Sequence, residues 1–128
     1  MQTSFLLLWM VFMHIIDDFV LQNVLAKFKQ KKFWLSHPDY KEIYKHDWII
    51  ALLAHAFEWT FMVMIPIAFW KYYFYVDIKF LIVFIINLII HAIIDHFKAN
   101  KMSINLVIDQ CLHLWQIFAT YIIFIKIF

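Results

Sequence analysis

The sequence predicts an all-α integral membrane protein, a four-helix bundle with short loops and a polar His/Asp core in its cytoplasmic half. Hydrophobic residues make up 66% of the 128 positions. Four apolar segments each approach the roughly 20 residues that a helix needs to cross a bilayer. These segments lack the alternating pattern of barrel strands, and only helices or closed barrels satisfy their backbone groups in lipid. We therefore expect membrane helices.

The predicted spans form a single membrane domain, residues 1–128. The second span contains Pro66, which is tolerable because neighbouring groups in a membrane bundle can satisfy the freed backbone atoms. Polar segments rich in lysine separate the spans and predict the connecting loops. The spans cover about 4–26, 48–70, 80–97 and 104–125.

Lysines are distributed unevenly between the predicted loops. Eight lie in the first and third loops, and three lie on the opposite side. Because cytoplasmic loops carry the excess of positive charge, we expect these two loops inside the cell and both termini outside. Abundant Ile, Phe, Lys and Asn favour an AT-rich bacterial or phage gene, and hence the inner membrane. The eight lysines are Lys27, Lys29, Lys31, Lys32, Lys41, Lys45, Lys98 and Lys101.

Each predicted span carries polar residues at helical spacing. In the first span, His14, Asp18 and Gln22 are four positions apart and share one helix face. An imidazole and a carboxylate at this spacing bring nitrogen and oxygen donors towards one point, as a mixed-ligand metal site requires. The spacing recurs in the third and fourth spans, and the second adds a histidine. The candidate metal ligands are His14, Asp18, His55, His91, Asp95, Asp109 and His113.

The candidate ligands are expected at similar depths in the membrane. With a rise of about 1.5 Å per residue, six of them fall about 10 to 18 Å from the cytoplasmic loop ends: His14, Asp18, His55, His91, Asp109 and His113. The other half of each span contains no ionisable residue. A channel or transporter needs polar groups in both halves, whereas a membrane enzyme needs only one entrance. The pattern favours an enzyme, with a metal-ion or proton transporter as the alternative.

Neighbouring polar residues admit more than one interpretation. Asp17 could be a ligand in place of Asp18, a hydrogen-bond partner of an imidazole, or a general base. Glu58 could be a general base or have a structural role, and Lys98 could hold a phosphate. Without metal, such buried groups could link helices or relay protons. The residues expected around the ligands are Gln22, Asn87 and Gln110.

Four motifs follow one another in the order HIIDDFVLQ, His55, HAIIDHFK and DQCLH. In this order they resemble a family of small bacterial and phage membrane proteins of unknown function, allied to inner-membrane metal-dependent hydrolases. The resemblance covers all four spans and implies the same seven His and Asp residues as the polar core, accompanied by Gln22, Lys98 and Gln110.

A more distant similarity points to phosphoester chemistry. The stretches HAIID and DQCLH are similar to ligand runs of zinc-dependent phospholipase C and single-strand nucleases. The chain departs from that group at Cys111, where the group has proline, and it has no counterpart of the group's N-terminal tryptophan ligand.

Seven candidate ligands exceed the three or four of one zinc ion, which predicts a two-metal site. We expect a hydrolase in which a metal-activated water attacks a phosphoester, such as a lipid phosphate. Zinc is the first expectation, with manganese and iron as alternatives. Two further interpretations are a structural protein stabilised by bound metal and a di-iron oxidoreductase. The second is disfavoured because di-iron bundles use several glutamates, and Glu42 and Glu58 are the only ones in the sequence.

The expected partners are membrane lipids and a second copy of the chain. Nucleic acid binding is not expected, because the sequence has no basic stripe with exposed aromatic residues.

Overall fold

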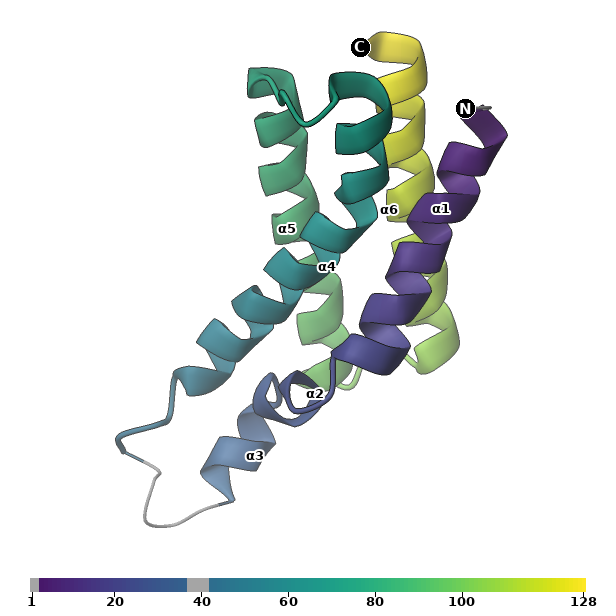
Figure 1. Cartoon of the computed structure of the whole chain (residues 1–128). Coiled ribbons are helices and arrows are strands. Elements are labelled where there is room, and N and C mark those ends of the chain that lie inside the picture. Colours follow the sequence, from purple (N-terminus) through teal and green to yellow (C-terminus); the bar gives the residue numbers. More distant parts are fainter. Residues whose placement is uncertain (1–2, 37–41) are drawn as a thin grey trace.

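The computed structural model describes residues 3–36 and 42–128. Within these ranges the chain forms four long helical stretches and no strand (Figure 1). All four stretches are long and apolar enough to cross a membrane, which confirms the all-α, four-helix prediction. The two chain ends lie at the same end of the bundle (Figure 1). The stretches are Thr3–Leu21, Asp47–Tyr72, Ile78–Ala99 and Leu106–Ile127.

The first long helix has two parts. Helix α1 covers Thr3–Ile16 and continues as a π-helical segment, η1, over Asp17–Leu21. The stretch therefore ends at Leu21 rather than near residue 26 as predicted. The reason is local, because Asn23 adopts a left-handed backbone conformation with φ of 33°, which a right-handed helix cannot continue.

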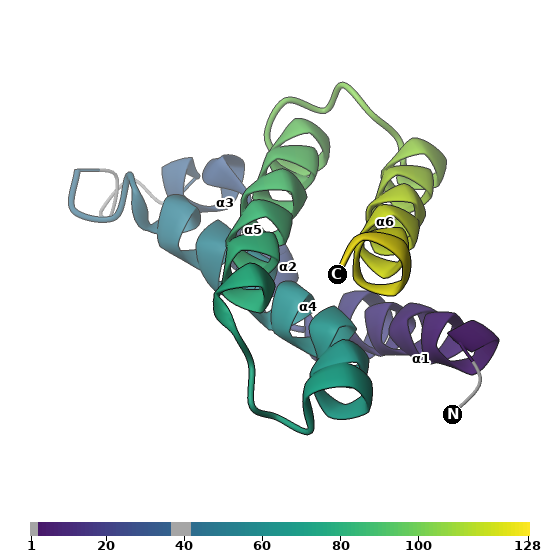
Figure 2. The same ribbon diagram turned by 90° about the horizontal axis from the view of Figure 1, so that it is seen from above.

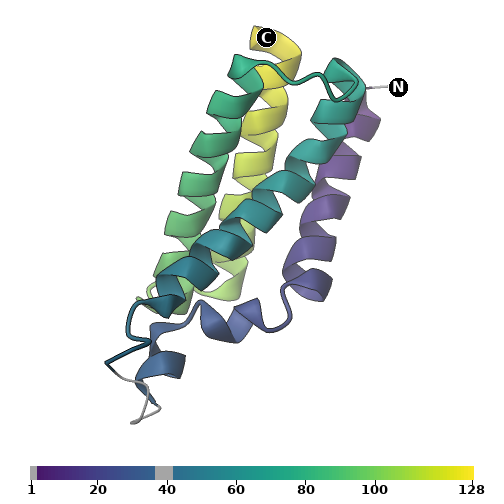
Figure 3. The same ribbon diagram turned by 60° about the vertical axis from the view of Figure 1, so that its left-hand side comes forward.

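The first connection is a folded segment rather than a short loop. It contains helix α2, Leu25–Phe28, and helix α3, Lys31–Leu35. Both lie at the end of the bundle opposite the termini, and the α2 segment runs across that end (Figure 3). Lys41, which was counted among the loop lysines, lies outside the described residues. The connection thus brings other lysines beneath the ends of the long helices.

Helix α4 covers Asp47–Tyr72 and accommodates Pro66 without interruption. Its end is set by Tyr73, which has a φ of 47°. The Lys71 ammonium group donates to the backbone carbonyl of Phe124 at 2.9 Å and so links this end of α4 to the end of the chain.

Polar caps start the last two long helices. Helix α5, Ile78–Ala99, begins after Asp77, whose side chain accepts a backbone N–H bond. Helix α6, Leu106–Ile122, begins after Asn105 in the same way and continues as the π-helical segment η3, Ile123–Ile127. Such caps satisfy backbone donors that have no partner within the helix.

The bundle is apolar in one half and polar in the other. Helix α4 packs against both α1 and α5, and α6 lies along α1 and α5 (Figure 2). An apolar core fills the half that contains the chain ends, while buried histidines and aspartates occupy the half next to α2. Large apolar side chains cover the outer faces, as contact with lipid requires. The largest fully buried members of the apolar core are Leu6, Met10, Trp59, Met64, Ile67, Ile117 and Phe124.

Candidate metal centre

Three overlapping groups of His and Asp side chains lie where the four long helices converge. In each group, one donor atom from every residue lies within 4.8 Å of the others. Six of the seven predicted ligands belong to these groups, and they come from η1, α4, α5 and α6. The groups are Asp18, His55 and His91; His91, Asp95 and His113; and Asp18, Asp109 and His113.

The donor separations fit a shared metal ion better than direct hydrogen bonds. Nε2 of His55 lies 3.3 Å from both Nε2 of His91 and Oδ2 of Asp95. Nε2 of His113 lies 3.4 Å from one carboxylate oxygen each of Asp95 and Asp109. Most N–H···O bonds are about 2.7–3.2 Å long, whereas two ligands about 2.05 Å from one tetrahedral ion lie about 3.3 Å apart. The cluster is therefore spaced for coordination.

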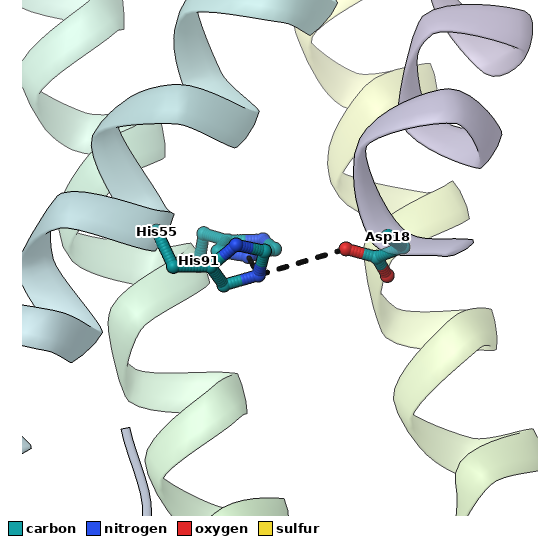
Figure 4. Close-up of side chains that lie close together, drawn as sticks. All are labelled: Asp18, His55 and His91. Carbon is teal, nitrogen blue, oxygen red and sulfur yellow. Dashed lines mark hydrogen bonds and ion pairs between the residues drawn. The ribbon is translucent and has the colours of Figure 1, made fainter. Parts of the chain in front are cut away.

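Asp18 faces the histidines of α4 and α5 from the opposite wall of the cluster. Figure 4 shows its carboxylate directed towards His55, with the ring of His91 alongside. Oδ1 of Asp18 lies 3.7 Å from Nε2 of His55 and is buried without a hydrogen-bond partner among the described residues. Because a buried polar atom is costly unless it is paired, this oxygen is a strong candidate for coordination.

Asp95 directs its two oxygens to different sides of the cluster. Oδ2 accepts a 2.5 Å hydrogen bond from the Lys29 ammonium group and faces His55 at 3.3 Å. Oδ1 instead faces His113 at 3.4 Å. A carboxylate with this arrangement can bridge two metal ions, which is the geometry that a two-metal site needs.

Asp17 lies behind His55 rather than within the three groups. Its Oδ2 is 3.7 Å from Nδ1 of His55, and Asp18 faces the other ring nitrogen. Successive side chains of a regular α-helix point about 100° apart, but the π-helical geometry of η1 lets both aspartates face α4. A carboxylate behind a coordinating histidine orients its ring and raises its basicity. The geometry favours Asp18 as the ligand and Asp17 as the supporting group.

The two predicted glutamines contact the cluster directly. The Gln22 side-chain nitrogen lies 3.0 Å from Nε2 of His55, and because an amide nitrogen can only donate, that Nε2 accepts. The ring proton of His55 therefore lies on Nδ1, which faces Asp17, and Nε2 would be free to coordinate a metal ion once the Gln22 amide gives up this hydrogen bond. Gln110 donates to Asp18 at 2.9 Å and to Asp109 at 3.1 Å.

His14 has the spacing of a ligand but belongs to none of the three groups. Nδ1 accepts from the indole N–H of Trp59 at 2.8 Å, so Nε2 carries the proton and donates to Gln110 at 3.1 Å. The Trp59 ring also stacks on His91, with centroids 4.2 Å apart. Sequence reasoning missed Trp59, although its position one helical turn after His55 was an available signal.

Two lysines reach the carboxylates of the cluster. Lys29 binds Asp95 and Lys98 binds Asp109, each at 2.5 Å. Lys98, named from the sequence as a residue that could hold a phosphate, binds Asp109, whereas the buried Lys29 holds Asp95. No local pattern predicts the burial of Lys29, because it depends on how α2 folds under the bundle. Asn100, at the end of α5, fixes that fold by donating to the Lys29 carbonyl at 3.0 Å.

Asn87 and Glu58 are not brought into the cluster. Asn87 accepts hydrogen bonds from Gln116 and Thr120, which tie α5 to α6 one turn from the histidines. Glu58 is half-buried and belongs to none of the three groups. Asn87 therefore supports the packing of the two helices that carry four residues of the cluster.

No family model, curated protein or solved structure matches this chain. The resemblance to membrane proteins allied to metal-dependent hydrolases therefore stays a prediction.

The substitution Lys29→Met is expected to lower the free energy of unfolding by about 3–5 kcal/mol, because it leaves the Asp95 carboxylate buried without its ammonium partner. Thermal unfolding in a neutral detergent, followed by circular dichroism, measures the loss. Lys45→Met is the matched control, since Lys45 pairs with the exposed Glu42 at 3.6 Å, where a pair contributes at most about 1 kcal/mol. Equal stability of the two variants would contradict the importance of the buried pair.

Proposed function

We propose that the protein is a membrane-embedded hydrolase that depends on divalent metal ions and cleaves a phosphoester such as a lipid phosphate. The observation that carries this proposal is the 3.3–3.4 Å spacing between the imidazole donors of His55 and His113 and the carboxylate of Asp95. The mixed nitrogen and oxygen donors suit zinc, with manganese and iron as alternatives.

Two ions would divide the ligands between the two sides of the cluster. Asp18 belongs to groups on both sides, and Asp95 directs one oxygen to each side, so these two carboxylates would bridge. When bound, such ions lower the pKa of a water molecule towards neutrality and stabilise negative charge on phosphoryl oxygens. The remaining ligands would be His55 and His91 on one side and Asp109 and His113 on the other.

Among the chain's own residues, Asp17 is the best candidate to accept the proton of the attacking water. It is fully buried beside His55, and both of its carboxylate oxygens lack a hydrogen-bond partner among the described residues. Glu58, the other candidate, also lies outside the three groups and is only half-buried. Trp59 lies over His91 at the boundary with the apolar core and excludes water from that side.

The apolar half of the bundle favours hydrolysis over transport. Leu6, Met10 and Trp59 are fully buried there, and the buried polar groups beyond the histidines between α5 and α6, Asn87, Gln116 and Thr120, are uncharged and bond to one another. A transporter needs a route through both halves, at least in alternating states. The alternative of a metal-ion or proton transporter predicts uptake without turnover and is tested below.

We further propose that the cluster opens towards the cytoplasm from the inner membrane. Lysines of α2, of α3 and of the connection between α5 and α6 surround this end of the bundle. Because cytoplasmic loops carry the excess of positive charge, this end would face the cytoplasm. Both termini, which lie at the opposite end (Figure 1), would then face outwards. A lipid phosphate of the inner leaflet would reach the cluster from the headgroup region.

We expect purified wild-type protein to carry about two divalent ions per chain, and the variant Asp18→Asn/Asp95→Asn/Asp109→Asn to carry none. Elemental mass spectrometry on the detergent-solubilised protein measures both, with circular dichroism to verify folding. The variant Glu42→Gln/Asp47→Asn removes carboxylates away from the cluster and should retain the wild-type metal content. Equal metal content in wild type and the triple variant would overturn the proposal.

The hydrogen bonds of His14 predict that it orients the site without coordinating. His14→Gln should therefore keep both ions, whereas His113→Gln should lose at least one, because His113 belongs to two of the three groups. The same elemental analysis compares them. If the His14 variant loses as much metal as the His113 variant, then His14 is a ligand and its hydrogen bonds to Trp59 and Gln110 do not persist in the metal-bound protein.

Metal-loaded protein in mixed micelles is expected to release inorganic phosphate from phosphatidic acid, a polyprenyl phosphate or a nucleotide. The triple aspartate variant should be slower by at least about 100-fold, because loss of metal removes the activated water. Phosphate release measures turnover. Metal uptake by proteoliposomes, with no turnover of any of these substrates, would contradict the hydrolase and support the transporter.

A further inference from the structure

A pocket of about 260 Å³ opens at the α2 end of the bundle, directly beside the metal cluster. Its polar lining consists of Lys29, Lys32 and Lys98 together with Gln22 and Gln30, and no carboxylate lines it. Three lysines and two glutamines therefore line a small space at the α2 end of the bundle. Such a lining favours an anion.

The pocket and the cluster share a wall. Lys29 and Lys98 line the pocket and also bind Asp95 and Asp109 of the cluster. Gln22 lines the pocket and contacts His55. A ligand in the pocket would thus be one side chain away from the metal ligands.

The lysines keep donors for a ligand after binding the carboxylates. An ammonium group has three N–H donors, and Lys29 and Lys98 each use one on a single carboxylate oxygen. Lys32 forms no ion pair within the described part of the chain and is exposed at the rim. The pocket therefore retains both positive charge and unused hydrogen-bond donors.

We propose that this pocket binds the phosphate group of a phosphomonoester, which is the substrate class of the hydrolase proposed above, and the inference rests on that proposal. The volume lies below the roughly 300–1,000 Å³ of sites that enclose a whole drug-sized ligand, so it suits a compact head group. A monoester phosphate carries close to two negative charges and three terminal oxygens, which suit a pocket lined by three lysines better than a singly charged diester does.

Hydrolysis in this position adds one water across the ester bond. The water oxygen forms a bond to phosphorus while the bond from phosphorus to the ester oxygen breaks. One proton of the water passes to the leaving oxygen, which gives an alcohol and inorganic phosphate. An apolar alcohol would remain among the exposed apolar side chains of the neighbouring helices.

Calorimetric titration of the detergent-solubilised wild-type protein with inorganic phosphate tests the pocket. Lys32→Gln and Lys98→Gln should each weaken phosphate binding about tenfold, as expected for one lost charge-assisted hydrogen bond. Lys27→Gln is the matched control, because Lys27 lies on α2 and is exposed but does not line the pocket. Its binding should stay within about twofold of wild type, since solvent screens its charge.

Unchanged phosphate binding in both pocket variants, or no binding by wild type, would overturn the inference. Phosphatidic acid in mixed micelles, with phosphatidylcholine as the control, identifies the source of the phosphate. If phosphatidic acid competes with inorganic phosphate in wild type and competes less well in Lys32→Gln, the result supports a lipid monoester. Phosphate binding without such competition supports a water-soluble monoester.

Metal content measured on the same samples separates this inference from the proposed function. If wild type carries two ions but binds no phosphate, the proposed function of the pocket is wrong and the metal centre is still supported. Phosphate binding that depends on Lys32 in protein that holds no metal would overturn the hydrolase and support the pocket as an anion site.

Discussion

The burial of the Asp95 carboxylate is the constraint on which the rest of the structure depends. Asp95 is 2% exposed in a helix that is apolar enough to cross a membrane, where a charged side chain costs at least about 2.5–3.5 kcal/mol. Lys29, His55 and His113 approach its oxygens from three other helices. The charge is tolerable only when α2, α4 and α6 pack around α5, so the candidate site also determines how the bundle assembles.

The position of the site follows from the way in which the first long helix ends. The left-handed backbone of Asn23 stops the helix and turns the chain under the bundle, and this turn delivers Lys29 to Asp95. The preceding π-helical segment allows neighbouring aspartates to face the same helix, one at each nitrogen of His55. A regular helix continued to residue 26 would supply neither arrangement. One π-helical segment and one left-handed residue thus lie where the polar groups meet, and π-helical segments are common at functional sites.

The four long helices and most of the cluster could be predicted because local periodicity encodes them. Apolar runs of sufficient length predicted the spans, and the four-residue spacing of His and Asp predicted which faces meet. The role of Lys29 could not be predicted, because its partner is 66 positions away and the contact depends on the turn at Asn23. His14 shows that four-residue spacing alone does not identify a candidate metal ligand. It shares the face of Asp18, yet an indole and an amide from other helices bind both of its ring nitrogens.

The choice of lysine at the mouth of the cluster has a chemical consequence. An arginine would present a planar fork that binds one carboxylate through two parallel bonds, whereas a lysine is a point charge with three separate donors. Lys29 and Lys98 can therefore hold a carboxylate with one donor and an anion with the others. Metal ions bound at Asp95 and Asp109 would neutralise the charge that attracts these ammonium groups, and would free them for phosphate. Because such coupling is reciprocal, a phosphate held by the lysines would in turn strengthen the binding of the metal ions.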